Sequence, residues 1–151
     1  PEEIILIGHS LGGLVSIIAR NRIKKVTKIV SLCSPPDITG LAKKWNGEKL
    51  KHSERDLPND KLKFRSFEVP YSFVEDALQY SAVEEVKKIH KPLMIFTALE
   101  DTSVTPELTE RIITNANNPY VVRQPNMGHN FRKSEKECNI VMTVIEKFLE
   151  K

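Results

Sequence analysis

The chain has 151 residues, of which 40% are hydrophobic and 28% charged, as expected for one ordinary globular domain. Its net charge of +3 includes no long basic run, which argues against nucleic-acid binding, and its longest apolar runs are too short for a membrane span. The two cysteines, Cys33 and Cys138, cannot define a disulfide framework, and no signal peptide is visible, so we expect reduced thiols and a cytoplasmic location.

Strand-like and helix-like segments alternate along the chain. Residues 4–7 form an apolar run that ends at Gly8, which is typical of a strand buried on both faces of a parallel sheet. From Leu11 to Arg20 the apolar residues recur at helical spacing. Further strands are expected at 28–32, 93–97 and 120–124, and further helices at 74–89, 106–114 and 135–150. This order predicts an α/β fold, with a parallel sheet flanked by helices.

The interval 38–73 breaks this alternation. It is long and polar, and it contains the turn-forming pairs Asn46-Gly47 and Pro58-Asn59. Two interpretations stay open, a lid-like insertion over an active site and a solvated surface excursion. Its basic side chains mildly favour an acidic substrate, although surface charge usually serves solubility.

The segment Gly8-His9-Ser10-Leu11-Gly12-Gly13 carries the strongest functional signal. It matches G-x-S-x-G between an expected strand and an expected helix, where a sharp turn would project the serine hydroxyl from the end of the sheet. Gly8 and Gly12 are expected to prevent side chains from colliding with the neighbouring strand or helix. The N–H of Leu11, at the helix start, is expected to serve an oxyanion hole. The usual phosphate-binding patterns do not fit this segment.

From this segment to its C-terminus the chain resembles the α/β-hydrolase family. In that family an acid and then a histidine follow the serine, on loops after later strands. Asp101, in A-L-E-D-T-S-V-T-P, resembles the family acid, with Ala98 in place of a glycine and one extra residue before Pro106. Glu100 is the competing carboxylate, and a plain turn is the structural alternative for Asp101.

His129 is the histidine that matches the family pattern. It lies in N-M-G-H-N-F, which resembles the G-H-x-F loop before the last helix of the family. The other histidines fit less well, because His9 lies inside the serine turn, His52 in the polar interval and His90 before its strand.

The resemblance implies a serine hydrolase that works through a Ser10–Asp101–His129 triad and an acyl-enzyme. No metal or organic cofactor is required by such a mechanism. Segments around residues 72–86 and 91–101 resemble esterases of the cinnamoyl and feruloyl type and serine-aminopeptidase-like hydrolases. We therefore expect a small-molecule carboxylic ester as substrate, with a thioester, lactone or small peptide as alternatives.

The chain also departs from the family pattern. Members of the family have further strands before the nucleophile strand, and one of the loops between them supplies a second oxyanion donor. We therefore expect residues 1–151 to form a single partial domain that lacks its N-terminal strands, with an exposed sheet edge that invites self-association. The alternative function is that of a truncated, non-catalytic chain that binds a small molecule or a partner chain.

Overall fold

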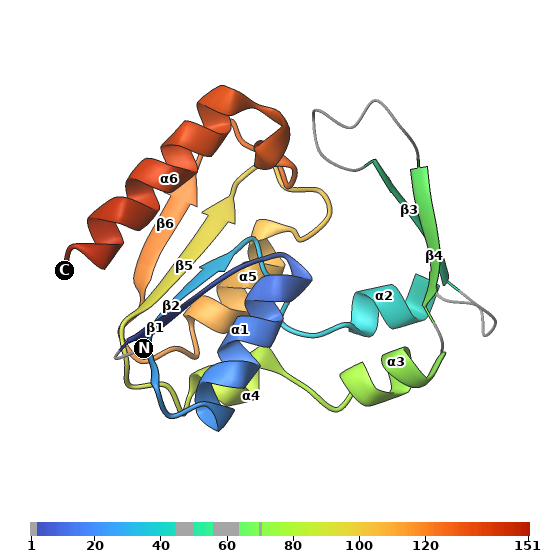
Figure 1. The fold of residues 1–151 in the computed structure, drawn as a ribbon, viewed down its shortest axis with the longest axis horizontal. Helices are drawn as coiled ribbons and strands as arrows, with labels where there is room; N and C mark the ends of the chain where they lie inside the picture. Colours follow the sequence, from blue (N-terminus) through green and yellow to red (C-terminus); the bar gives the residue numbers. More distant parts are fainter. Residues whose placement is uncertain (1–2, 45–49, 56–63, 70) are drawn as a thin grey trace. The chain divides into compact units, whose positions relative to one another are not determined.

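The computed structural model describes residues 3–44, 50–55, 64–69 and 71–151. The chain divides into two compact units, Pro1–Pro36 with Ser81–Lys151, and Asp37–Tyr80 (Figure 1). The turn pairs Asn46-Gly47 and Pro58-Asn59, predicted within the interval 38–73, lie outside the described residues.

A parallel sheet forms the centre of the first unit. Its four strands have the order β1-β2-β5-β6, and each neighbouring pair is parallel. The strands are β1 (Ile4–His9), β2 (Val26–Leu32), β5 (Leu93–Ala98) and β6 (Tyr120–Gln124). Because parallel strands end at the same edge of a sheet, the loops after all four strands gather there, where sites in α/β folds usually form.

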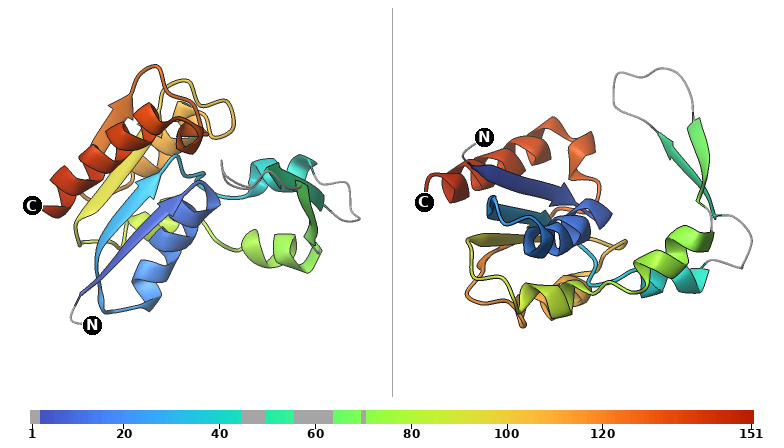
Figure 2. Two further views of the ribbon diagram at one scale, coloured as in Figure 1. Left: turned by 45° about the horizontal axis from the view of Figure 1, so that its top comes forward. Right: turned by 60° about the horizontal axis from the view of Figure 1, so that its bottom comes forward.

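Helices cover both faces of this sheet, as the sequence predicts. Figure 2 shows α6 on one face and the other helices of the unit on the opposite face. The helices are α1 (Leu11–Arg22), α4 (Ala82–Val86), α5 (Pro106–Ile113) and α6 (Glu135–Leu149), with a short 3-10 turn η1 (Phe131–Lys133) before α6. Pro106 starts α5, where its missing N–H costs no helical hydrogen bond.

The hydrophobic core under α6 is built on the two central strands. Val30 of β2 and Met94 and Phe96 of β5 are fully buried there and pack against Ile145 and Phe148 of α6. Burying each such side chain stabilises the fold by about 1.5–3 kcal/mol. The loops at the carboxyl edge are thus anchored on a rigid base.

Strand β1 is less buried than the sequence predicts. Ile5 and Ile7 are 36% and 52% exposed, so the expected burial on both faces is wrong. The physical reason is position, because in the described part of the chain β1 pairs with β2 alone and forms the sheet edge. The core under α6 draws on β2 and β5 but on no residue of β1.

The second unit contains a two-stranded antiparallel sheet and two helices. Its elements are α2 (Thr39–Lys44), β3 (Leu50–Arg55), β4 (Phe64–Val69) and α3 (Tyr71–Ala77). The helix expected at 74–89 is wrong, since α3 ends at Ala77 and α4 begins separately at Ala82. Ser81 separates them, because its extended backbone caps α4 and its hydroxyl accepts a hydrogen bond from the Glu84 N–H.

None of the helices in the described ranges is long and apolar enough to cross a membrane.

Candidate active site

Ser10 lies on a strained turn between β1 and α1. Its φ of 57° and ψ of −124° are unusual for a residue with a side chain, and such a conformation costs about 1–3 kcal/mol. The turn is held by hydrogen bonds from the Ser10 N–H to the Leu32 carbonyl (2.8 Å) and from the Gly13 N–H to the Ser10 carbonyl (3.0 Å). The strain is therefore sustained by the sheet on one side and the helix on the other.

Close backbone packing at this turn depends on Gly8 and Gly13. A Cβ on Gly8 would lie 2.1 Å from the Gly12 carbonyl oxygen, and a Cβ on Gly13 would lie 1.7 Å from the Ser34 Oγ. The steric role expected for Gly12 is wrong, because a Cβ there would meet nothing within 4 Å among the described residues. The second close contact therefore lies at Gly13, one residue after Gly12, where α1 packs against Ser34 in the loop after β2.

Asp101 and His129 are joined by a short hydrogen bond. His129 Nδ1 lies 2.6 Å from Asp101 Oδ2, and the Asp101 side chain is completely buried. The other carboxylate oxygen, Oδ1, accepts hydrogen bonds of 2.8 Å from the backbone N–H groups of Ser103 and Val104. The carboxylate is therefore fixed in one orientation, with a single oxygen directed at the imidazole.

The environment of Asp101 keeps it ionised at neutral pH. Burial alone would raise the pKa of its carboxyl, but the hydrogen bonds from His129, Val104 and Ser103 outweigh burial and leave the pKa below its ordinary value. A carboxylate can only accept hydrogen bonds, so His129 must carry its proton on Nδ1.

The other ring nitrogen of His129 faces Ser10. Its Nε2 lies 3.1 Å from Ser10 Oγ, and as the unprotonated nitrogen it accepts a hydrogen bond from the hydroxyl. The structure thus brings together the three residues predicted for the triad, from the loops after β1, β5 and β6.

The competing candidates lie elsewhere. The Glu100 side chain is exposed, and its backbone N–H donates to the Met127 carbonyl (3.0 Å). His90 is exposed in the loop before β5, at the opposite edge of the sheet. The side chain of His52 lies outside the described residues.

Leu11 occupies the first position of α1, directly after Ser10. The first N–H groups of a helix have no acceptor within the helix and carry its positive dipole end. The Leu11 N–H is therefore available to an oxygen atom bound above Ser10.

The sequence did not reveal the position of His9 beside His129. Its Nε2 lies 3.0 Å from the His129 carbonyl oxygen, and the two imidazole centroids are 4.7 Å apart. The variable position of G-x-S-x-G accepts many residues, so the motif gave no signal. The alternation of side chains along β1 does indicate the direction of His9, because it places the imidazole on the sheet face that Phe131 covers.

Cys33 is a second residue whose position the sequence did not reveal. It follows β2 with a positive φ of 47° and is buried against Asp101. Burial raises the pKa of the thiol to about 12, with the Ala98 backbone opposing this effect and the Asp101 charge adding to it. As expected from the sequence, Cys33 and Cys138 are free thiols.

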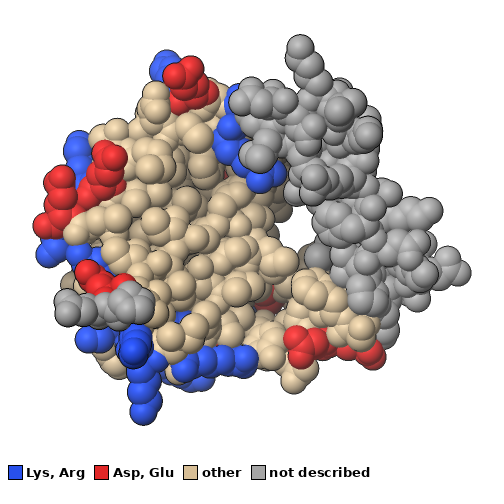
Figure 3. All heavy atoms as spheres, in the orientation of Figure 1, with Lys and Arg blue, Asp and Glu red and all other residues tan. Residues whose placement is uncertain are grey.

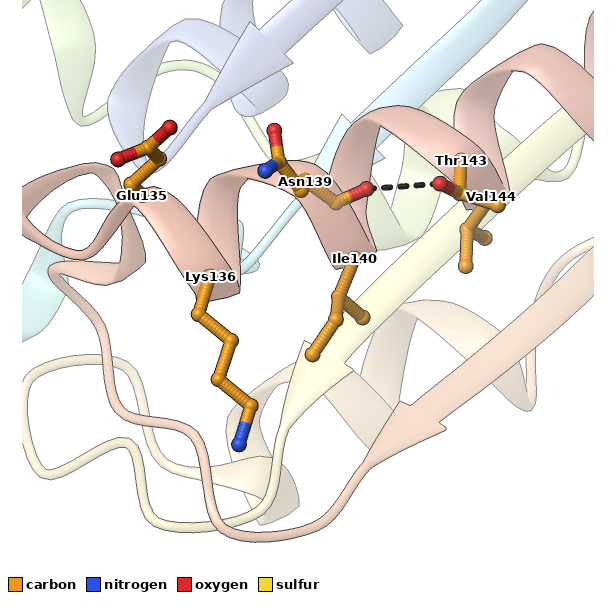
Figure 4. Close-up of a pocket in the computed structure, with 6 residues that line it drawn as sticks. All are labelled: Glu135, Lys136, Asn139, Ile140, Thr143 and Val144. Atoms are coloured by element: carbon orange, nitrogen blue, oxygen red, sulfur yellow. Dashed lines mark hydrogen bonds between the residues drawn. The ribbon is translucent and has the colours of Figure 1, made fainter.

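A shallow groove also lies on the surface of α6 (Figure 4). It is lined by the side chains of one helix, and Ser10, Asp101 and His129 are not among them. The helix residues that line it are Glu135, Lys136, Asn139, Ile140, Thr143 and Val144. It is therefore separate from the candidate active site.

Several solved esterase and lipase structures have a similar fold. An esterase domain of a Rhodothermus marinus protein is 20% identical, with a TM-score of 0.72 over 93% of this chain and 58% of that one. Est1E of Butyrivibrio proteoclasticus, solved with bound ferulic acid, is 22% identical, with a TM-score of 0.71 over 98% and 59%. A Paleococcus ferrophilus monoacylglycerol lipase is 18% identical, with a TM-score of 0.66 over 99% and 69%.

The chain thus spans less than two thirds of the length of the first two of these structures. No curated protein sequence matches it. A sequence model of the PGAP1-like alpha/beta domain matches residues 1–137, which is most of the chain. The chain has the fold of solved α/β-hydrolases, and it belongs to the PGAP1-like alpha/beta domain family.

Proposed function

We propose that the chain carries the catalytic triad of a serine hydrolase that cleaves carboxylic esters. The observation that supports this best is the continuous hydrogen-bond path through His129, 2.6 Å from Asp101 on one side and 3.1 Å from Ser10 on the other. Nucleophile, base and orienting acid are the three parts of acyl transfer by serine.

In the first step the Ser10 oxygen attacks the ester carbonyl carbon while His129 Nε2 takes the hydroxyl proton. Asp101 stabilises the resulting imidazolium and holds the ring in place. His129 then gives the proton to the departing alcohol as the carbon–oxygen bond breaks, which leaves an acyl group on Ser10.

In the second step a water molecule replaces the alcohol. His129 removes a proton from the water, whose oxygen attacks the acyl carbonyl, and then returns that proton to the Ser10 oxygen as the acid leaves. The negative oxygen of each tetrahedral intermediate would be bound by the Leu11 N–H.

The Leu11 N–H alone does not complete an oxyanion hole. An oxyanion hole of this type uses a second N–H from a loop before the nucleophile strand. Loss of one oxyanion donor reduces turnover by about 10²–10³-fold. Full activity is therefore proposed where a second donor completes the oxyanion hole, and the alternative function is that of a non-catalytic chain that binds a small molecule or a partner chain.

The substrate class rests on the structural likeness. Est1E was solved with ferulic acid, and other similar structures are those of an esterase domain and a monoacylglycerol lipase. A carboxylic ester is common to these proteins, so it is the first choice for this chain.

We propose in addition that part of the second unit, within residues 38–73, acts as a lid.

Hydrolysis of p-nitrophenyl acetate, p-nitrophenyl butyrate and methyl ferulate by the full-length polypeptide tests the proposal. Ser10→Ala should reduce kcat/KM by about 10⁴–10⁶-fold on whichever ester is cleaved. Thr143→Ala, which removes an exposed hydroxyl on α6, is the matched control and should leave kcat/KM unchanged. Equal hydrolysis by the wild type and Ser10→Ala would refute the assignment.

A further inference from the structure

His9 links the two halves of the proposed site. It is the last residue of β1, directly before Ser10, and its imidazole reaches the loop after β6. The contact with His129 joins a side chain to a main-chain carbonyl, at 3.0 Å between residues 120 positions apart. One residue of the rigid sheet thus connects the serine turn with the backbone that carries the base.

The hydrogen bond fixes the tautomer of His9. A carbonyl oxygen only accepts, so His9 must carry its proton on Nε2. His129 has the opposite tautomer, with its proton on Nδ1, because Nδ1 faces the Asp101 carboxylate. The two neighbouring imidazoles therefore hold their protons on different nitrogens, each set by its own acceptor.

The packing around His9 restrains the His129 ring as well. The rings of His9 and His129 are tilted by 39° with centroids 4.7 Å apart, and Phe131 meets His9 edge-on at 4.9 Å. Phe131 is itself buried against Phe96 of the sheet. His129 is thus contacted by Asp101 at one nitrogen and by His9 at its ring face and its carbonyl.

The surroundings of His9 favour an uncharged ring. Burial lowers the pKa of the ring below its ordinary value, the charges of His129 and Arg132 lower the pKa further, and the hydrogen bond to His129 and the Asp101 charge raise it without reversing the shift. A neutral ring beside His129 avoids repulsion when His129 becomes positively charged during proton transfer.

We propose that His9 is a positioning residue, whose Nε2–H bond to the His129 carbonyl and whose ring contact keep His129 Nε2 at hydrogen-bond distance from Ser10. This inference rests on the proposed serine hydrolase function. It assigns His9 no contact with substrate, so its effect should appear in kcat and not in KM.

Two substitutions at position 9 separate the hydrogen bond from the packing. His9→Phe keeps a ring but removes the donor, whereas the amide of His9→Gln can still donate to the carbonyl. With p-nitrophenyl butyrate and the full-length polypeptide, His9→Phe should lower kcat by about 10–100-fold, since displacement of a catalytic group by 1 Å costs about that much. KM should stay within about threefold, and His9→Gln should recover most of the lost kcat.

The controls keep this test separate from that of the proposed function. His90→Phe, on an exposed histidine before β5, should retain wild-type kcat. Wild-type kcat in His9→Phe, or equal losses in His9→Phe and His9→Gln, would overturn the role of His9 while leaving the hydrolase assignment intact. An inactive wild type that Ser10→Ala does not change would instead overturn the proposed function and, with it, this inference.

A measurement without turnover covers the case in which His9→Phe does not fold. Two-dimensional ¹H–¹⁵N spectra of histidine-labelled wild-type protein report which ring nitrogen carries the proton. The proposal requires the Nε2–H form for His9 and the Nδ1–H form for His129 at neutral pH. An Nδ1–H form for His9 would refute the hydrogen bond whatever the activity.

Discussion

Asp101 is the residue on which the electrostatics of the proposed site depend. Its carboxylate is buried, ionised and held by three hydrogen bonds, one of them to His129. Glu100, its neighbour in sequence, directs its side chain to solvent. The two adjacent carboxylates therefore have very different expected contributions to activity.

Replacement of each carboxylate by its amide tests this difference. Asp101→Asn should lower kcat on the order of 10⁴-fold, because an amide no longer enforces the Nδ1–H tautomer of His129 or stabilises its positive charge. Glu100→Gln should stay near the wild-type rate. Steady-state hydrolysis of a p-nitrophenyl ester measures both, and a larger loss in Glu100→Gln would contradict the assignment of the acid.

Cys33 and Cys138 should differ in their reactivity toward alkylating reagents. With a pKa of about 12, buried Cys33 is ionised in roughly one molecule in 10⁴ at pH 8. Cys138, on α6, is only partly buried. Iodoacetamide should modify Cys138 first in the native protein, as peptide mass mapping would reveal, and both residues in denaturant. Preferential modification of Cys33 in the native protein would mean that the loop after β2 opens readily.

At the level of elements, the junction of β1 and α1 depends on Gly8, as expected, and on Gly13 in place of Gly12. Gly8→Ala and Gly13→Ala should each destabilise the protein by about 1–3 kcal/mol or more, because each Cβ would overlap neighbouring atoms. Gly12→Ala should be neutral or stabilising by up to about 1 kcal/mol, because Gly12 is an exposed helical residue with open space around it. Urea unfolding measures the free energy of unfolding of the three variants. A decrease in Gly12→Ala as large as that in Gly8→Ala would contradict this prediction.

Much of the first unit could be predicted from the sequence. β6 has the predicted bounds, and β5 extends one residue beyond them, since Pro92 and Pro125 mark boundaries that a ladder of hydrogen bonds cannot cross. The triad positions followed from the same strand ends together with the family pattern.

Other features could not be read from the sequence, for physical reasons. The break between α3 and α4 depends on a single cap at Ser81, in a segment whose apolar spacing suits one continuous helix. The hairpin of β3 and β4 lies in charged sequence without clear alternation, so its pairing gave no strand signal. The contact of His9 with His129 joins loops that are far apart in sequence, and local patterns cannot report it.

At the scale of the whole molecule, the free edge of the sheet is the main unexplained surface. Figure 3 shows a broad area without charged side chains on the face that carries β1 and α1 in Figure 1. Ile5 and Ile7 of β1 and Val15 of α1 are exposed. An uncharged edge strand is a template for pairing with further polypeptide. We expect this edge to pair with the same edge of a second copy of the chain.

The 151-residue polypeptide on its own should therefore self-associate through β1. Sedimentation should show a mass that rises with concentration, and Ile7→Lys should suppress the rise, because an edge lysine disfavours strand pairing. Met142→Lys on α6 is a matched control, since Met142 and Ile7 are both 52% exposed. A monomer at every concentration, or equal suppression by both variants, would contradict a role for this edge.

The nucleophilicity of Ser10 is the central claim, and covalent labelling tests it most directly. Full-length protein treated with a fluorophosphonate should gain one adduct by intact mass, and peptide mapping should locate it on Ser10. Ser10→Ala should abolish the adduct, and His129→Ala should slow its formation by several orders of magnitude, because the hydroxyl then lacks its base. An unlabelled wild-type protein that is folded, or an adduct that persists in Ser10→Ala, would contradict the account.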